Sequence, residues 1–109
     1  MKGRRERTTK EWPASLMEAV QERYNIPELP LDDMPSGFEA VLDNVLAELP
    51  ERKRNILEMR YKQGMTLKEI GEEYKVTAER IRQIKNEALH WVKKPAQWNR
   101  LMDAMSSKQ

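Results

Sequence analysis

Four polar side chains in one segment have the types and the spacing needed to recognise the edges of DNA bases. They recur at intervals of three and four residues in the string VTAERIRQIKNEALHWV, and they are Glu79, Arg82, Gln83 and Asn86. Such spacing places side chains on one face of a helix. Arginine pairs with guanine through two hydrogen bonds, glutamine or asparagine does so with adenine, and glutamate accepts a hydrogen bond from cytosine. Glu79 is the most informative of the four, because phosphates would repel its carboxylate unless it engages a base or an arginine.

The helix that would carry these residues spans 77–94. Its other side is apolar at the same spacing, which predicts an amphipathic helix packed on the rest of the protein. The apolar positions are Ile81, Ile84, Ala88 and Trp91. Thr77 is suited to cap the N-terminus with its side-chain oxygen, and Pro95 ends the helix because proline cannot continue one.

A shorter helix precedes this one and indicates a helix-turn-helix. The string TLKE, residues 66–69, matches a capping box and opens that helix. Gly71 lies inside it, where glycine costs about 1 kcal/mol relative to alanine, so we expect the second helix to approach closely there. Val76 in the turn is apolar and would lie under both helices. Spacing alone leaves an ordinary helical hairpin without a role in DNA binding as an alternative.

Candidate DNA contacts follow from the helix-turn-helix arrangement, in which the start of the second helix enters the major groove. The residues predicted to read base edges are Thr77, Ala78, Glu79, Arg82, Gln83 and Asn86. The residues predicted to meet backbone phosphates are Arg60, Thr66, Lys68, Arg80 and Lys85. For each lysine taken singly, a solvated surface position is the alternative.

The first third of the chain contains two more possible helix starts. Capping boxes at residues 15–18 (SLME) and 36–39 (SGFE) each predict the beginning of a helix. Between these helices we expect an extended, acidic connector at 25–36, because its prolines block a continuing helix. Those prolines are Pro27, Pro30 and Pro35.

The remaining signals complete an all-α fold. Pro50 ends one helix and suits the first turn of the next, which Gly64 ends in a left-handed conformation. After Pro95 an apolar stripe at helical spacing, which we expect to pack on the domain's own core, comprises Trp98, Leu101, Met102 and Met105. The predicted fold is a small helical domain with a helix-turn-helix, plus an N-terminal helix and a short C-terminal helix. We expect a basic tail, helix and connector over 1–35, the helix-turn-helix domain over 36–95, and an amphipathic segment over 96–109.

Composition excludes several classes of function. The 109 residues include no cysteine and one histidine, His90, so we expect no metal site and no histidine-dependent nucleophile. No glycine-rich phosphate loop and no clustered catalytic groups are present, so we predict neither an enzyme nor a cofactor or small-molecule ligand. No apolar run reaches the roughly 20 residues of a membrane span, and no signal peptide is evident. We therefore expect a cytoplasmic location.

Charge is distributed unevenly along the chain, although the net charge is only +2. Residues 24–51 contain seven acids and no lysine or arginine, whereas residues 52–109 contain 14 basic and 7 acidic residues. A polyanion partner on the basic side would suit this distribution, and solvated helix faces would explain it equally well.

From about residue 38 to residue 95 the chain resembles region 4 of bacterial RNA polymerase sigma factors. The strings that carry the resemblance are LPERKRNILEMRY, TLKEIGEEYKVTAERIRQIKNEAL and KKP. Within them, VTAERIRQI is close to the recognition-helix signature of that family. The resemblance implies a helical domain that reads the promoter element near position −35 of double-stranded DNA and docks on the β flap of the polymerase core.

The resemblance also implies individual roles. Glu79, Arg82 and Gln83 match base-contacting positions of the family. Backbone contacts or supports are implied for Thr77, Arg80, Arg60 and Lys68. The family usually has an arginine where this chain has Ala78, which removes one expected contact. Nothing in the chain resembles region 2 of sigma factors, so we do not expect it to act alone as a complete sigma factor.

Two hypotheses of function remain at the sequence level. The first is sequence-specific binding of double-stranded DNA in transcription initiation or its regulation. The second is a protein-interaction module that docks on RNA polymerase or a sigma factor and reads little DNA itself. A homodimer formed through the first or last helix is a related possibility.

Overall fold

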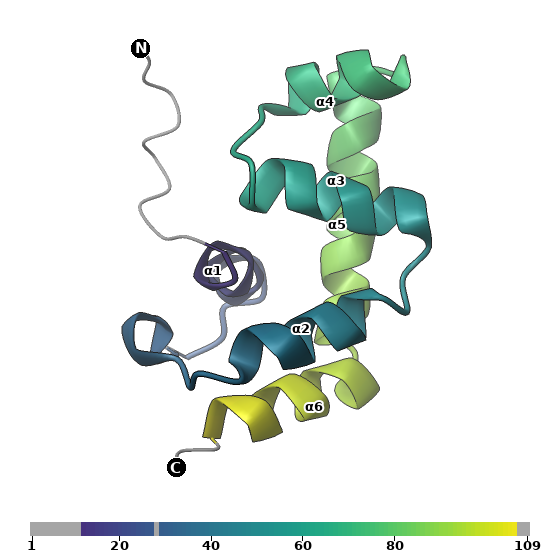
Figure 1. Ribbon diagram of the computed structural model, residues 1–109. Helices are drawn as coiled ribbons and strands as arrows, with labels where there is room; N and C mark the ends of the chain where they lie inside the picture. The colour runs from purple at the N-terminus through teal and green to yellow at the C-terminus, as the bar shows by residue number, and fades with distance from the viewer. Residues whose placement is uncertain (1–11, 28, 107–109) are drawn as a thin grey trace.

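The computed structural model describes residues 12–27 and 29–106. Residues 1–11 of the predicted segment 1–35, which include its basic tail, and residues 107–109 of the predicted segment 96–109 lie outside the described residues. Within the described part every regular element is helical, which confirms the all-α prediction. The elements are α1 (Ala14–Arg23), the 3₁₀ helix η2 (Leu31–Asp33), α2 (Phe38–Leu46), α3 (Glu51–Tyr61), α4 (Leu67–Tyr74), α5 (Ala78–Lys93) and α6 (Pro95–Ser106). In Figure 1, α5 is the long upright helix; α1, α3, α4 and α6 contact it, whereas α2 packs mainly on α6.

The first half of α5 belongs to a helix-turn-helix with α3 and α4. Ile81 and Ile84 face Ile70 of α4 and Ile56 of α3, and these four residues form one buried cluster. Val76 from the turn packs on its edge. In Figure 1, α4 lies at the upper end of α5 and α3 crosses near its middle. The predicted packing of the second helix on the first is thus confirmed.

The second half of α5 packs into a separate and larger core, shared with α1, α2 and α6. Its residues there are Ala88, Leu89 and Val92. Fully buried partners from the other helices include Leu16, Met17 and Val20 of α1, Phe38, Leu42 and Val45 of α2, and Leu101 of α6. The α6 stripe therefore packs on the domain's own core as predicted, with Trp98 and Met102 half-buried at its edge. Since α5 takes part in both cores, its position depends on helices at both ends of the chain.

Two of the three predicted capping boxes are wrong. Ser15 lies inside α1 and is buried, and its Oγ donates a hydrogen bond to the carbonyl of Tyr61 at 2.6 Å. The N-cap of α1 is Pro13, so Ser15 already belongs to the first turn of the helix and cannot cap it. Ser36 stands one residue before Gly37, the N-cap of α2, and that cap makes no side-chain hydrogen bond. The box at 66–69 is confirmed in both directions, with Thr66 N to Glu69 Oε1 at 2.9 Å and Glu69 N to Thr66 Oγ1 at 3.1 Å.

The connections also refine the predictions. The segment 25–36 is not extended throughout, because it contains η2, and the buried Leu31 anchors that turn to the larger core. Pro50 is the N-cap of α3 and not part of its first turn. Gly64 has a φ of 75°, which confirms the predicted left-handed conformation after α3.

Candidate nucleic-acid interface

The turn between α4 and α5 is tight enough to require glycine at position 71. A Cβ atom at Gly71 would lie 2.6 Å from the carbonyl oxygen of Val76 and 3.3 Å from the carbonyl carbon of Thr77. The chain that approaches is thus the turn leading into α5, whereas the prediction placed the second helix itself there. Lys75 adopts a left-handed conformation with a φ of 58°, and Val76 N donates to Gly71 O at 2.9 Å. This geometry fixes the direction in which α5 leaves the turn.

The first residues of α5 project into solvent. Thr77 caps the helix as predicted, with its Oγ1 accepting a hydrogen bond from Arg80 N at 3.0 Å. Five of the six predicted base-reading residues have exposed side chains, namely Thr77, Ala78, Glu79, Arg82 and Gln83. This end of α5 is therefore free to enter a groove.

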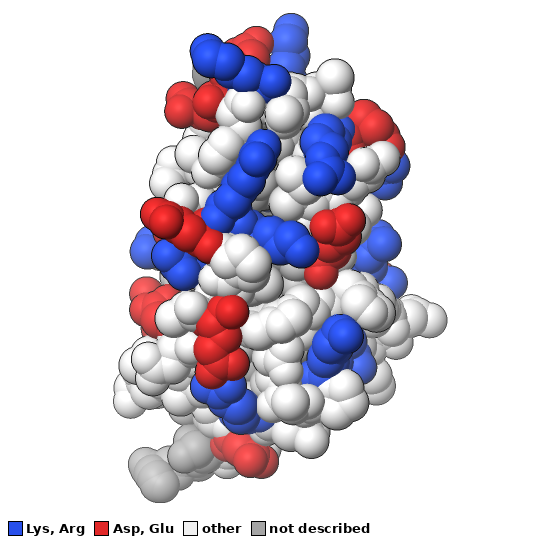
Figure 2. Space-filling model, turned by 90° about the vertical axis from the view of Figure 1, so that its right-hand side faces the viewer, with Lys and Arg blue, Asp and Glu red and all other residues white. Residues whose placement is uncertain are grey.

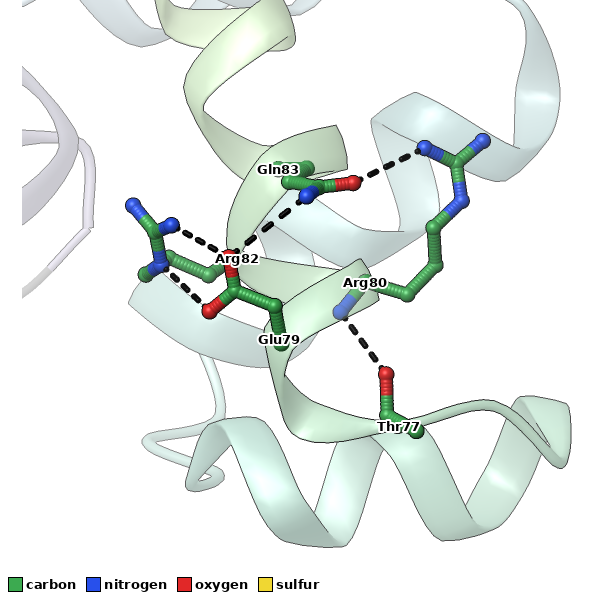
Figure 3. A network of polar contacts seen from close by, with 5 residues as sticks. All are labelled: Thr77, Glu79, Arg80, Arg82 and Gln83. Atoms are coloured by element: carbon green, nitrogen blue, oxygen red, sulfur yellow. Dashed lines mark hydrogen bonds and ion pairs between the residues drawn. The ribbon is translucent and has the colours of Figure 1, made fainter.

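A polar network links four side chains of this surface (Figure 3). Arg82 donates from Nε to Glu79 Oε1 at 3.0 Å and from Nη2 to Glu79 Oε2. Gln83 Nε2 donates to Glu79 Oε2 at 3.5 Å, and Arg80 Nη1 donates to Gln83 Oε1 at 3.4 Å. Glu79 thus engages an arginine, which is one of the two roles inferred for an acid at this position.

The network favours the charged form of Glu79. The hydrogen bond from Arg82 is the largest influence, and with the positive charge of Arg82 and the hydrogen bond from Gln83 it lowers the pKa of the Glu79 carboxyl. The same pairing raises the pKa of Arg82. Both shifts favour the charged forms, and the two hydrogen bonds hold the Arg82 guanidinium beside the Glu79 carboxylate.

Asn86 differs from the other predicted base readers. Its side chain is half-buried, and its Oδ1 is inaccessible and makes no hydrogen bond with any described residue. A bidentate contact with adenine needs both the oxygen and the nitrogen of the amide. Asn86 could make that contact only after its side chain turned outward.

The predicted backbone-contacting residues belong to α3, to the start of α4 and to α5. Thr66 and Lys68 are exposed at the start of α4. Arg60 is half-buried near the end of α3 and donates from Nη1 to Met65 O at 2.9 Å, which ties α3 to the approach to α4. Arg80 and Arg82 extend to opposite sides of α5 (Figure 3). Lys85 is half-buried, one turn after Arg82.

Charge alone does not mark a phosphate-binding face on the side of the molecule shown in Figure 2. Basic and acidic side chains are interspersed there. Ion pairs elsewhere on the described surface also neutralise basic residues, such as Lys53 with Glu87 at 3.5 Å and Arg100 with Glu48 at 2.8 Å. A nucleic-acid interface is therefore indicated by the helix-turn-helix geometry and by the composition of its exposed face.

A comparison with protein families matches residues 45–94 to the family described as sigma-70, region 4. These residues form a sigma region 4-like domain. The match begins at the end of α2 and takes in the whole of α3, α4 and α5. No solved structure matches the chain. Domains of this family are DNA-binding helix-turn-helix modules of transcription that interact with DNA and RNA polymerase, and the family is not a catalytic one.

Several parts of the protein lie outside the region 4-like domain as matched. They are α1, η2, most of α2, and α6. No helix among the described residues could cross a membrane, and no group of acidic, histidine or cysteine side chains there could hold a metal ion. One basic residue near the interface was not among the predicted contacts. The positive charge of Arg23 on α1 contributes to lowering the pKa of Lys85, and this effect depends on the tertiary structure because the two residues are far apart in the sequence.

Proposed function

We propose that the protein binds double-stranded DNA sequence-specifically in transcription initiation or its regulation, with α5 reading a promoter element like that at −35. The observation that carries this proposal is the exposed network of Glu79, Arg82 and Gln83 at the start of the second helix of the helix-turn-helix. These side chains offer an acceptor and donors for base edges, and the Thr77 cap holds their backbone. Such an activity belongs in the cytoplasm, where DNA and polymerase are present.

The backbone contacts proposed for the same complex are Arg60, Thr66, Lys68, Arg80 and Lys85. Arg60 belongs to α3, Thr66 and Lys68 to the start of α4, and Arg80 and Lys85 to α5. Contacts to phosphate position a protein on DNA without selecting a sequence. Replacing these residues should weaken binding equally for all duplexes, which distinguishes them experimentally from the base readers.

The direct test is selection of bound sequences from a random duplex pool, with and without core RNA polymerase. We expect enrichment of one short element by the wild-type protein. Arg82→Ala or Gln83→Ala should abolish preference at single base pairs, at about 1–3 kcal/mol for each base that is no longer read. Lys68→Ala is the matched control, since removal of a backbone contact should reduce affinity without changing the selected element.

The outcomes separate the proposal from its alternatives. Enrichment that requires polymerase would support a promoter-reading role carried out on the enzyme, and a symmetric element would indicate a homodimer. Equal binding of all sequences, with and without polymerase, would contradict sequence readout. Retention of polymerase by the Glu79→Ala/Arg82→Ala/Gln83→Ala triple variant, combined with no enrichment by wild type, would instead favour a docking module.

A further inference from the structure

The end of α1 that carries Arg23 lies against α5, since Tyr24 Oη and His90 Nδ1 are 3.4 Å apart. The basic residues that α1, α3 and α5 contribute near this contact form one group, namely Arg23, Arg60, Arg82 and Lys85. Within this group Lys85 is half-buried, one turn after Arg82. Burial is the largest cause that lowers the pKa of Lys85, and the positive charges of Arg60 on α3, Arg23 on α1 and Arg82 on α5 lower it further. Like charges brought together in this way repel one another, and a bound anion would relieve that repulsion.

The contribution of α1 to this group follows from how firmly the helix is attached. Ser15 Oγ donates to the carbonyl of Tyr61 at the end of α3. Leu16, Met17 and Val20 of the same helix are fully buried in the larger core. Helix α1 is therefore fixed beside α3 and α5, both of which it contacts. This packing keeps Arg23 at the end of α1 that lies against α5.

The side chain of Arg23 is available to a ligand. It is exposed, and its guanidinium lies 5.8 Å from the ring centroid of the adjacent Tyr24. Glu22 is exposed beside it in the sequence. The charge of Arg23 lowers the pKa of Tyr61 and the charge of Glu22 raises it. An arginine is better suited than a lysine to bind phosphate oxygens through two parallel hydrogen bonds.

This basic group lies next to the proposed base-reading face, because Arg82 belongs to both. When a helix enters the major groove, the phosphate backbones run along its two sides. We propose that α1 is part of the DNA-binding surface, and that Arg23 binds a backbone phosphate beside the groove together with Arg60 and Lys85. This inference rests on the proposed function and extends the interface beyond the matched residues 45–94.

The test is the salt dependence of duplex binding by the full chain. Removing one phosphate contact reduces the slope of log affinity against log salt by about 0.9. A fourfold rise in salt should therefore reduce the affinity of Arg23→Ala about 3.5-fold less than it reduces the affinity of the wild type. The selected sequence should be unchanged. Glu22→Gln should act in the opposite direction and tighten binding at low salt, because it removes a negative charge next to the contact.

Arg100→Ala is the matched control. Arg100 is also an exposed arginine outside the matched residues, but it lies on α6 and its charge is already paired with Glu48. The Arg100→Ala variant should have the same slope of log affinity against log salt as the wild type. A wild-type slope in Arg23→Ala, or an altered sequence preference in that variant, would overturn the inference.

The failure of this inference differs from failure of the proposed function. If the wild type selects an element and Arg23→Ala binds as wild type does, only the inference fails. If the wild type shows no sequence preference but Arg23→Ala still reduces the slope, sequence readout fails and α1 remains part of a duplex-binding surface. If the wild type binds no duplex at all, both fail.

Discussion

At the level of single residues, Glu79 and Arg82 act as a pair. The carboxylate accepts two hydrogen bonds from the guanidinium, so each side chain limits the conformations of the other. An arginine held in one orientation loses less conformational entropy when it contacts a base. The pairing thus makes Glu79 a positioning residue for Arg82 within the proposed readout.

The charge coupling of this pair leads to a prediction for Arg82→Gln. Since Arg82 lowers the pKa of Glu79, the substitution should raise that pKa toward the ordinary range. A carboxyl whose folded-state pKa is depressed stabilises the fold above its unfolded pKa, and this contribution is lost as the pH falls through the folded value. In the wild type the stabilisation contributed by the ionised Glu79 carboxylate should therefore be lost at a more acidic pH than for a glutamate with an ordinary pKa. Carboxyl chemical shifts followed by NMR against pH would measure the change. Lys68→Gln should leave the titration of Glu79 unaltered. An unchanged Glu79 titration in Arg82→Gln would contradict the pairing.

Ala78 gives the second prediction at this level. It is exposed in the first turn of α5, at the position for which the resemblance to sigma region 4 implies an arginine. Ala78→Arg should add one base or phosphate contact, so the selected element should gain a preferred base pair at about 1–3 kcal/mol. Comparison of the elements selected by the two proteins from a random duplex pool would measure this gain. An identical selected element and unchanged affinity would show that position 78 does not face DNA.

At the level of elements, the helix-turn-helix depends on local caps and on one close backbone approach. The Thr66–Glu69 box satisfies the start of α4, and Thr77 does the same for α5. Both caps were predictable because their chemistry is contained within four residues. Ser15 and Ser36 present the same local pattern, but neither forms a cap.

Thr66→Ala should therefore destabilise the fold by about 0.5–2 kcal/mol, since it leaves the amide of Glu69 without its acceptor. Chemical denaturation would measure the free energy of unfolding. Ser36→Ala is the control, because that exposed serine caps nothing, and we expect no measurable change. Equal destabilisation of the two variants would mean that the hydrogen bond from Glu69 N to Thr66 Oγ1 does not add to the stability of the fold.

Gly71→Ala should also destabilise the protein, here by about 1–3 kcal/mol. The new methyl group would lie 2.6 Å from a backbone oxygen, so the turn itself would have to shift. The same shift should redirect α5 and weaken duplex binding. Gly37→Ala adds a methyl group with no neighbour within 4 Å, so it should cost clearly less stability than Gly71→Ala and leave duplex binding unchanged. Thermal unfolding and duplex binding of the two variants, measured in parallel, would test both expectations.

At the level of the whole molecule, α5 joins two hydrophobic cores. Ile81 and Ile84 lie in the helix-turn-helix core, while Ala88, Leu89 and Val92 lie in the core formed with α1, α2 and α6. Helices outside the region 4-like domain therefore support the reading helix through its second half. Without them, these apolar side chains would face water.

Leu101→Ala should consequently destabilise the protein by about 2–5 kcal/mol, because a fully buried side chain of α6 is replaced by a cavity. The destabilisation should be seen throughout α5, including its reading end, as faster amide hydrogen exchange. Asp103→Ala, at an exposed position on the same helix, should cost less than about 0.5 kcal/mol. Faster exchange confined to α6 would show instead that the two cores unfold independently.

The features that could be predicted from the string of residues are those encoded locally. Helical periodicity predicted the all-α fold, two threonine caps marked the starts of α4 and α5, and side-chain chemistry identified the exposed face of α5. Each of these features depends on residues within one or two helical turns of each other, so a short pattern is enough to reveal it.

The remaining features depend on tertiary packing. In the folded protein Ser15 Oγ donates a hydrogen bond to the carbonyl of Tyr61, and the Oδ1 of Asn86 is buried. The positive charge of Arg23 contributes to lowering the pKa of Lys85. It also divided the apolar face of α5 between two cores. These outcomes involve residues far apart in the chain. Their contacts leave no periodic signal in the sequence, because they arise from how the helices pack and not from the preference of any one segment.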